Sequence, residues 1–138
     1  MKNAKKTLNV VLIAFIDEKG RVMLNKRSDA NSEMWELIGG GIEKGESEVL
    51  AIRREVLEEL GYTIESIDDE LCFIDSFEYE NEKMQSLVHV FTAKYPGIEK
   101  FNDSEEIFIK DLELFSKVEA LQLVLLPMTR IILEKDLL

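Results

Sequence analysis

The chain has 138 residues, 46% of them hydrophobic and 33% charged, with a formal net charge of −11. This length and composition predict a single globular domain over residues 1–138 that buries its own core. The 28 acidic residues against 17 basic ones argue against a long nucleic-acid partner, because binding a phosphate backbone needs an excess of cations. A small nucleotide that arrives with a bound divalent ion remains compatible with this charge.

The N-terminal region superficially resembles a secretion signal, since Lys2, Lys5 and Lys6 precede an apolar run over residues 8–16. The run is too short to span a membrane, and no small-residue cleavage site follows it. A single cysteine excludes an internal disulfide. We therefore expect a cytoplasmic protein without a membrane partner, either a monomer or a homodimer.

Several segments have the apolar or alternating pattern of β-strands. They are residues 7–16, 21–27, 71–79, 84–95 and 107–109. The polar residues 80–83 separate two of these segments and predict an antiparallel hairpin.

Two further segments carry helix signals. Ser47 and Gly61 have the residue types of an N-cap and a left-handed C-cap, which predicts a helix with limits near 47 and 60. Pro127 precedes an apolar stretch and predicts a second helix that covers the sheet. Residues 28–46 are expected to form an irregular loop, and the pattern as a whole predicts an α/β fold with a mixed sheet between helices.

The first predicted helix carries a stripe of carboxylates. Glu55, Glu58 and Glu59 stand at positions i, i+3 and i+4, so they share one side of the helix and repel one another. A divalent cation would offset this repulsion, and oxygen ligands suit Mg²⁺ or Mn²⁺. The single Cys72 and the single His89 are not expected to build a thiolate or imidazole site for zinc.

A glycine-rich loop precedes this helix, with glycines at positions 39, 40, 41 and 45. Glycine permits positive φ angles and lets backbone groups approach a ligand closely. Such a loop suits phosphates or metal ions.

The spacing of Gly40, Glu46 and the run from Arg54 to Tyr62 resembles a complete Nudix box. One departure lies just upstream, where many family members have proline and this chain has Ile38. Loss of that proline makes the loop less stiff and is expected to lower the stability of the fold by at most about 1 kcal/mol. The resemblance implies a Nudix-type α/β/α sandwich in which the box forms a loop and a helix against the sheet.

The resemblance also implies roles for individual residues. The family glutamates that match Glu55, Glu58 and Glu59 bind divalent metals, and one of them, which differs between subfamilies, serves as general base. We expect Glu55 and Glu59 to be metal ligands and Glu58 to act as both ligand and base, with a base on a later loop as the alternative. Arg54 matches an arginine that orients a catalytic glutamate, and its i+4 spacing to Glu58 makes that contact feasible. Gly40 is expected to contribute backbone geometry near the metal.

Other candidates carry less weight. A further acidic ligand or base is expected from Glu105 or Glu106, for which a polar turn is an equally good interpretation. The strand residue His89 is more typical of packing than of acid–base catalysis. Cys72 is expected to be a buried strand residue.

A few aromatic residues could stack on a nucleobase, although strand aromatics are more typical of a core. They are Trp35, Phe77, Tyr79 and Phe91.

The activity implied is a divalent-metal-dependent hydrolysis of a diphosphate linkage in a nucleotide. The first hypothesis is a nucleoside triphosphate pyrophosphohydrolase that releases a nucleoside monophosphate and pyrophosphate. Alternatives within enzymes are hydrolysis of ADP-ribose or another nucleotide sugar, and cleavage of dinucleoside polyphosphates. A nucleotide-binding regulator without turnover is the alternative from another class.

Overall fold

The computed structural model describes residues 6–27, 33–102 and 111–135. In this part of the chain, seven strands form one sheet whose path runs β3–β2–β1–β6–β5, while β4 also pairs with β1 and β7 with β2. The strands are β1 (Lys6–Ile16), β2 (Val22–Lys26), β3 (Trp35–Glu36), β4 (Ile38–Gly41), β5 (Asp69–Tyr79), β6 (Glu82–Lys94) and β7 (Asp111–Phe115).

The sheet is mixed, as predicted. β1 runs parallel to β6 over its whole length, whereas the other pairs are antiparallel. β5 and β6 form the predicted hairpin, with Tyr79 opposite Glu82. Glu80 and Asn81 form its turn with φ angles of 50° and 66°, the backbone that a tight two-residue hairpin turn requires.

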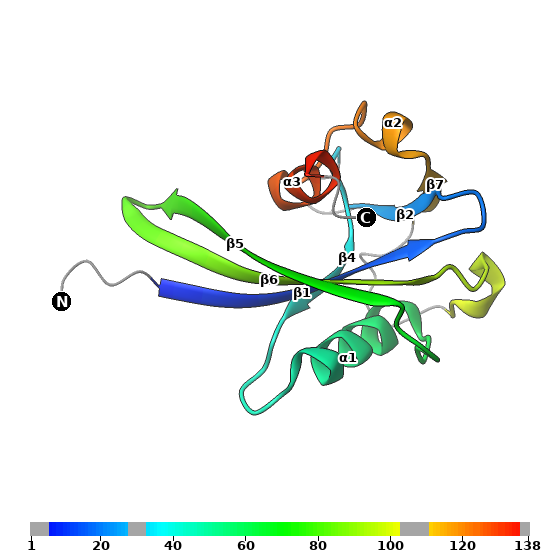
Figure 1. Ribbon diagram of the computed structural model, residues 1–138, viewed down its shortest axis with the longest axis horizontal. Coiled ribbons are helices and arrows are strands. Elements are labelled where there is room, and N and C mark those ends of the chain that lie inside the picture. The colour runs from blue at the N-terminus through cyan, green and yellow to red at the C-terminus, as the bar shows by residue number, and fades with distance from the viewer. Residues whose placement is uncertain (1–5, 28–32, 103–110, 136–138) are drawn as a thin grey trace.

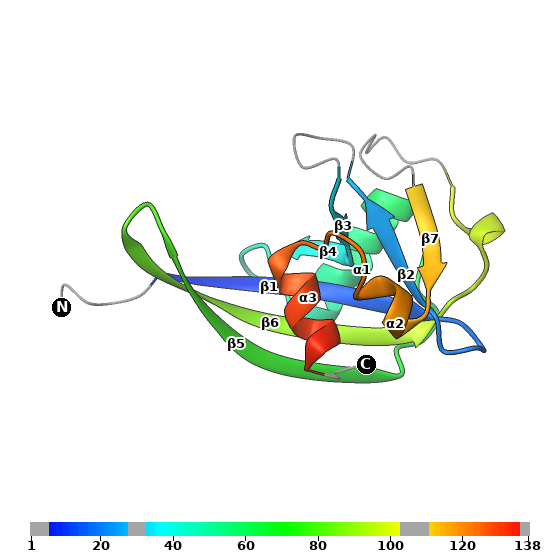
Figure 2. The same ribbon diagram turned by 90° about the horizontal axis from the view of Figure 1, so that it is seen from above.

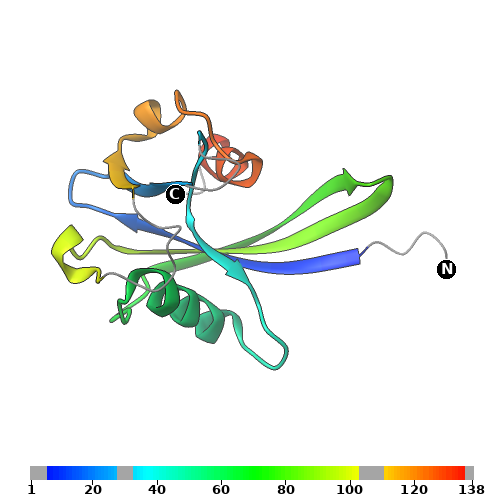
Figure 3. The ribbon, with the colours of Figure 1, turned by 180° about the vertical axis from the view of Figure 1, so that it is seen from behind.

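Helices cover both faces of the sheet (Figures 1 and 3). Helix α1 (Glu48–Leu60) lies on one face, and the short α2 (Lys117–Ala120) and α3 (Pro127–Glu134) lie on the other. Seen from above, α3 lies over the middle of the sheet (Figure 2). This arrangement confirms the predicted α/β fold with a mixed sheet between helices.

Each face has its own hydrophobic core. Under α1, Ile52, Val56 and Leu60 pack against the β1 side chains Val11 and Ile13, all of them buried. Under α3, Ile132 and Leu133 pack with Ala14, Val88 and Val90. Because side chains alternate across a strand, β1 and β6 supply residues to both cores.

The predicted segments differ from the structure in several places. Residues 28–46 do not form only an irregular loop, because β3 and β4 lie within them. Neither β7 nor α2 was predicted, and a short 3-10 helix at Ile98–Lys100 was also missed. The strand predicted at 107–109 lies outside the described residues.

The helices at 47–60 and from Pro127 are confirmed within one or two residues. Among the described residues, none of the helices is long and apolar enough to cross a membrane.

Candidate active site

Helix α1 is held at both ends by the predicted caps. Oγ of Ser47 accepts a hydrogen bond from the backbone N–H of Leu50 at 3.1 Å. Gly61 adopts a left-handed conformation, with φ of 62°, and its N–H donates to the carbonyl of Leu57 at 3.0 Å. These caps satisfy backbone groups that the helix cannot pair internally, so its limits follow from local sequence.

The buried face of α1 decides where its glutamates lie. Ile52, Val56 and Leu60 face the core, which rotates the neighbouring positions to the rim of the helix. The side chain of Glu55 is 14% exposed and that of Glu58 is 48% exposed. One carboxylate oxygen of Glu59 is buried. The predicted stripe therefore runs from the core edge to solvent.

Arg54 joins several of these carboxylates. Its Nη1 donates to Oε1 of Glu55 at 3.1 Å and to Oε2 of Glu58 at 3.4 Å, which confirms the predicted contact with Glu58. Its shortest contact goes to Glu46, from Nε to Oε2 at 2.6 Å, and Nη2 also donates to Oε1 of Glu46 at 3.0 Å. Nη2 also donates to the carbonyl of Gly41 at 2.9 Å. The arginine thus ties the loop to the helix.

Sequence reasoning missed the main partner of Arg54. It matched Glu46 to an acidic position of the box without naming a partner, whereas the structure gives this carboxylate a two-pronged contact with the guanidinium. Oε1 of Glu46 also accepts the backbone N–H of Glu43 at 2.9 Å. The family spacing of Glu46 and Arg54 was the signal that could have paired them.

The charged groups in this network shift one another's pKa values. The hydrogen bond from Arg54 lowers the pKa of Glu46, and the same pairing raises the pKa of Arg54. Burial raises the pKa of Glu55, an effect that Arg54 opposes and that the charges of Glu58 and Glu46 reinforce. A single arginine therefore leaves Glu55 short of compensating positive charge.

Two adjacent glycines let β4 approach this network. A Cβ atom at Gly40 would lie 2.5 Å from Oε1 of Glu55, so only glycine leaves room for the carboxylate in its present position. Gly39 has a φ of 155°, and a Cβ atom there would overlap the carbonyl oxygen of Val11. Gly40 leaves room for the carboxylate of Glu55, and Gly39 leaves room for the adjacent strand β1.

The donor atoms suit a hard divalent cation. Glu55, Glu58 and Glu59 offer carboxylate oxygens, and Gly40 brings backbone next to Glu55. As the side chains stand, no three Asp, Glu, His or Cys residues among the described ones converge on one point. Arg54 contacts both Glu55 and Glu58, so it holds positive charge where a cation is expected. The donor chemistry fits such an ion.

Other side chains near the helix have structural partners. Nη1 of Arg53 donates to the carbonyl of Ile64 at 2.6 Å and fastens the segment after α1. Cys72 was expected to be buried, but it is exposed because β5 lies at the edge of the sheet path. His89 is buried, as the packing interpretation predicted.

The aromatic candidates mostly pack within the protein. Phe91 is buried in the core under α1, and Trp35 stacks edge-on against Phe115 with ring centroids 4.9 Å apart. The side chains of Phe77 and Tyr79 lie outside the described part, as do Glu105 and Glu106.

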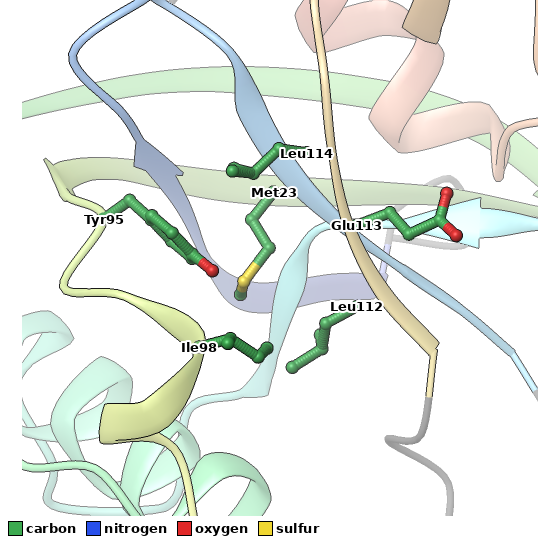
Figure 4. A pocket seen from close by; sticks show the side chains of 6 residues that line it. All are labelled: Met23, Tyr95, Ile98, Leu112, Glu113 and Leu114. Carbon is green, nitrogen blue, oxygen red and sulfur yellow. The ribbon is translucent and has the colours of Figure 1, made fainter.

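A pocket of about 270 Å³ lies between β2, β7 and the segment after β6 (Figure 4). Its lining is mostly apolar and consists of Met23, Tyr95, Ile98, Leu112, Glu113 and Leu114. Sequence reasoning missed it because β7, which supplies half of the lining, was not predicted.

Known proteins resemble this chain over most of its length. The family model for the NUDIX domain matches residues 5–133. A crystal structure of the MutT NUDIX hydrolase from Burkholderia pseudomallei has a TM-score of 0.74 and 26% identity, covering 94% of this chain and 98% of that one.

The curated relatives that match in sequence include one from Escherichia coli K12 and one from Danio rerio. The dihydroneopterin triphosphate diphosphatase of Escherichia coli K12 is 28% identical over 72% of this chain. The oxidized purine nucleoside triphosphate hydrolase of Danio rerio is 32% identical over 66% of it. The alignments cover 63% and 58% of those relatives, so the chain matches somewhat less than two thirds of their length.

Proposed function

The chain belongs to the NUDIX family, and from that membership we propose that it is a divalent-metal-dependent hydrolase that cleaves a diphosphate linkage in a nucleotide. The observation that carries the proposal is the network of Arg54 with Glu46, Glu55 and Glu58. A stack of carboxylates that one arginine compensates only in part attracts a further cation. The family as a whole generally needs divalent metal ions.

The proposed ion is Mg²⁺ or Mn²⁺, held by Glu55, Glu58 and Glu59 with help from the backbone at Gly40. Such an ion neutralises phosphate oxygens and makes a bound water more acidic. The protein's own part is to place these carboxylates, and the contacts of Arg54 restrict the positions that Glu55 and Glu58 can take.

Glu58 is the proposed general base. Its side chain is about half exposed, so water and substrate can reach it. In the proposed step the water oxygen forms a bond to phosphorus, the bridging P–O bond breaks, and the water proton passes to the carboxylate. The bridging oxygen leaves with the departing phosphate group, so the charges balance at each stage.

The substrate class that we propose first is a nucleoside triphosphate. Both curated relatives are named for triphosphate substrates, which supports this class for a chain of the same family. The products would be a nucleoside monophosphate and pyrophosphate. Nucleotide sugars and dinucleoside polyphosphates remain the alternatives, and a small nucleotide remains the expected partner in the cytoplasm.

Mass-spectrometric product analysis tests the proposal. The protein is incubated with Mg²⁺ or Mn²⁺ and a panel of triphosphates, nucleotide sugars and dinucleoside polyphosphates, with a metal-free sample beside each. We expect one triphosphate to yield monophosphate and pyrophosphate only when metal is present. Cleavage of another class would correct the substrate, and nucleotide binding without any product would favour the regulator.

A further inference from the structure

A second group of chemically active side chains lies on β5 and β6, at the start of α1. His89 on β6 is only 7% exposed, and its Nδ1 atom is buried without a hydrogen-bond partner. A buried polar atom without a hydrogen bond is costly, since it has lost its contacts with water. The proposed hydrolytic mechanism makes no use of this histidine.

The register of the hairpin brings two further ligand types to His89. Cys72 lies directly opposite His89, so the two side chains share one face of the sheet with Cβ atoms about 5 Å apart. Glu70 lies two residues before Cys72 on β5 and therefore points to the same face. Thiol, imidazole and carboxylate thus lie at neighbouring positions of two adjacent strands. Strands β5 and β6 lie side by side along the sheet (Figure 1).

The distance between the imidazole and the carboxylate is informative. Nδ1 of His89 lies 3.5 Å from Oε2 of Glu70, yet no hydrogen bond joins them. Two ligand atoms bound tetrahedrally at about 2.0–2.2 Å from a zinc ion lie roughly 3.3–3.6 Å apart. The separation is therefore long for a hydrogen bond and suitable for two ligands of one ion.

We propose that Cys72, His89 and Glu70 form a zinc-binding site with an open fourth position. As the side chains stand, no three such groups among the described residues converge on one point. Binding thus requires the exposed thiol of Cys72 to turn about its single side-chain bond. A thiolate with an imidazole selects zinc over Mg²⁺, which prefers oxygen ligands.

The other imidazole nitrogen supports this assignment. Nε2 of His89 lies 3.9 Å from Oε1 of Glu48, the first residue of α1. A metal-binding histidine commonly directs its second nitrogen toward a carboxylate, which orients the ring. Sequence reasoning did not expect the one cysteine and the one histidine to form a zinc site, whereas the hairpin register places them together with a carboxylate.

Titration with Co²⁺, a coloured substitute for Zn²⁺, tests the site directly. We expect Co²⁺ to give a thiolate-to-metal absorption band in the near ultraviolet, which Co²⁺ held only by the α1 carboxylates would not give, and added Zn²⁺ to abolish that band. Cys72→Ser should remove the band, and Glu70→Gln should weaken binding by about tenfold or more. His89→Gln should weaken it further, but this residue is buried, so its fold is checked by circular dichroism.

Glu78→Gln is the matched control, because Glu78 is an exposed carboxylate on the same strand and face as Glu70. It should bind Co²⁺ as the unmodified protein does. A Co²⁺ spectrum without a thiolate band, or Zn²⁺ affinity unchanged in both Cys72→Ser and Glu70→Gln, would overturn the proposal. Since Cys72 is exposed, its substitution leaves the fold intact and the result interpretable.

Discussion

Helices α1 and α3 cover opposite faces of the same sheet, but their arginines have different partners. Arg130 of α3 donates to the backbone carbonyls of Leu121 and Leu123, at 3.5 and 3.0 Å. Arg54 of α1 instead contacts the carboxylates of Glu46, Glu55 and Glu58. One arginine satisfies the backbone of a connecting segment, whereas the other compensates a cluster of negative charges.

The contrast teaches which polar groups serve the fold. Around α3 the polar contacts satisfy backbone groups, including the hydroxyl of Thr129, which accepts from the N–H of Leu37 at 3.3 Å. Around α1 burial raises the pKa of Glu55, so the charged carboxylate is disfavoured where it lies. A strained set of charges next to a well-packed core is typical of a functional site.

The largest expected effect is on turnover, which a substitution on α1 should reduce and a substitution on α3 should not. Glu58→Gln should reduce turnover by about 10²–10⁴-fold, because it removes the proposed general base. Stability should change little, since the side chain is half exposed. Glu134→Gln, at the exposed end of α3, is the control and should leave both turnover and unfolding unchanged. Equal turnover in the two variants would remove Glu58 from the mechanism.

The next effect is on stability, which a core substitution under α3 should lower without changing turnover. Ile132→Ala on α3 should lower the free energy of unfolding by about 2–5 kcal/mol, because the side chain is fully buried and its removal leaves a cavity. Turnover per folded molecule should stay near that of the unmodified protein. Urea denaturation measures the first quantity, and activity corrected for the folded fraction measures the second. A loss of activity in the folded protein would contradict the assignment of activity to the α1 face alone.

Two adjacent glycines of β4 should differ in whether their substitution affects turnover or stability. Gly40→Ala should reduce turnover by about 10²-fold, because its Cβ would displace the flexible carboxylate of Glu55. Gly39→Ala should mainly destabilise the protein, because its Cβ would overlap the rigid backbone of Val11. Thermal unfolding and turnover of both variants check this. A folded, fully active Gly40→Ala protein would show that the position of Glu55 does not matter.

The smallest expected effect is a pH dependence of stability. The pKa of Glu46 is lowered from 4.5 by Arg54, so its pairing stabilises the folded state fully above that value. The contribution is lost as the pH falls from 4.5 through the lower folded-state pKa. Glu46→Gln should therefore flatten the acid limb of the curve of unfolding free energy against pH. An identical acid limb in the variant would mean that this pairing contributes no linkage.

Local signals explain which parts of the fold sequence reasoning predicted. The limits of α1 follow from Ser47 and Gly61, which act on backbone groups within four residues of themselves. The hairpin follows from two alternating segments around a polar link. In contrast, β4 contains three glycines, which have poor strand propensity, and it forms because β1 pairs with it.

In the candidate site too, some features follow from local sequence spacing and others depend on how the chain folds. Its glutamates and Arg54 could be named from spacing along one helix, and the contact of Arg54 with Glu58 followed from an i+4 relation. The stronger contact with Glu46 depends on how the loop folds back to the helix, eight residues away. The exposure of Cys72 depends on strand order, which no local pattern specifies.

Metal binding by the α1 carboxylates tests the central claim most directly. Titration with Mn²⁺, followed by the electron paramagnetic resonance signal of the free ion, compares the unmodified protein with Glu55→Gln and Glu134→Gln. The account predicts that Glu55→Gln weakens Mn²⁺ binding by about tenfold or more, while Glu134→Gln binds as the unmodified protein does. Equal Mn²⁺ affinity in all three proteins would contradict it.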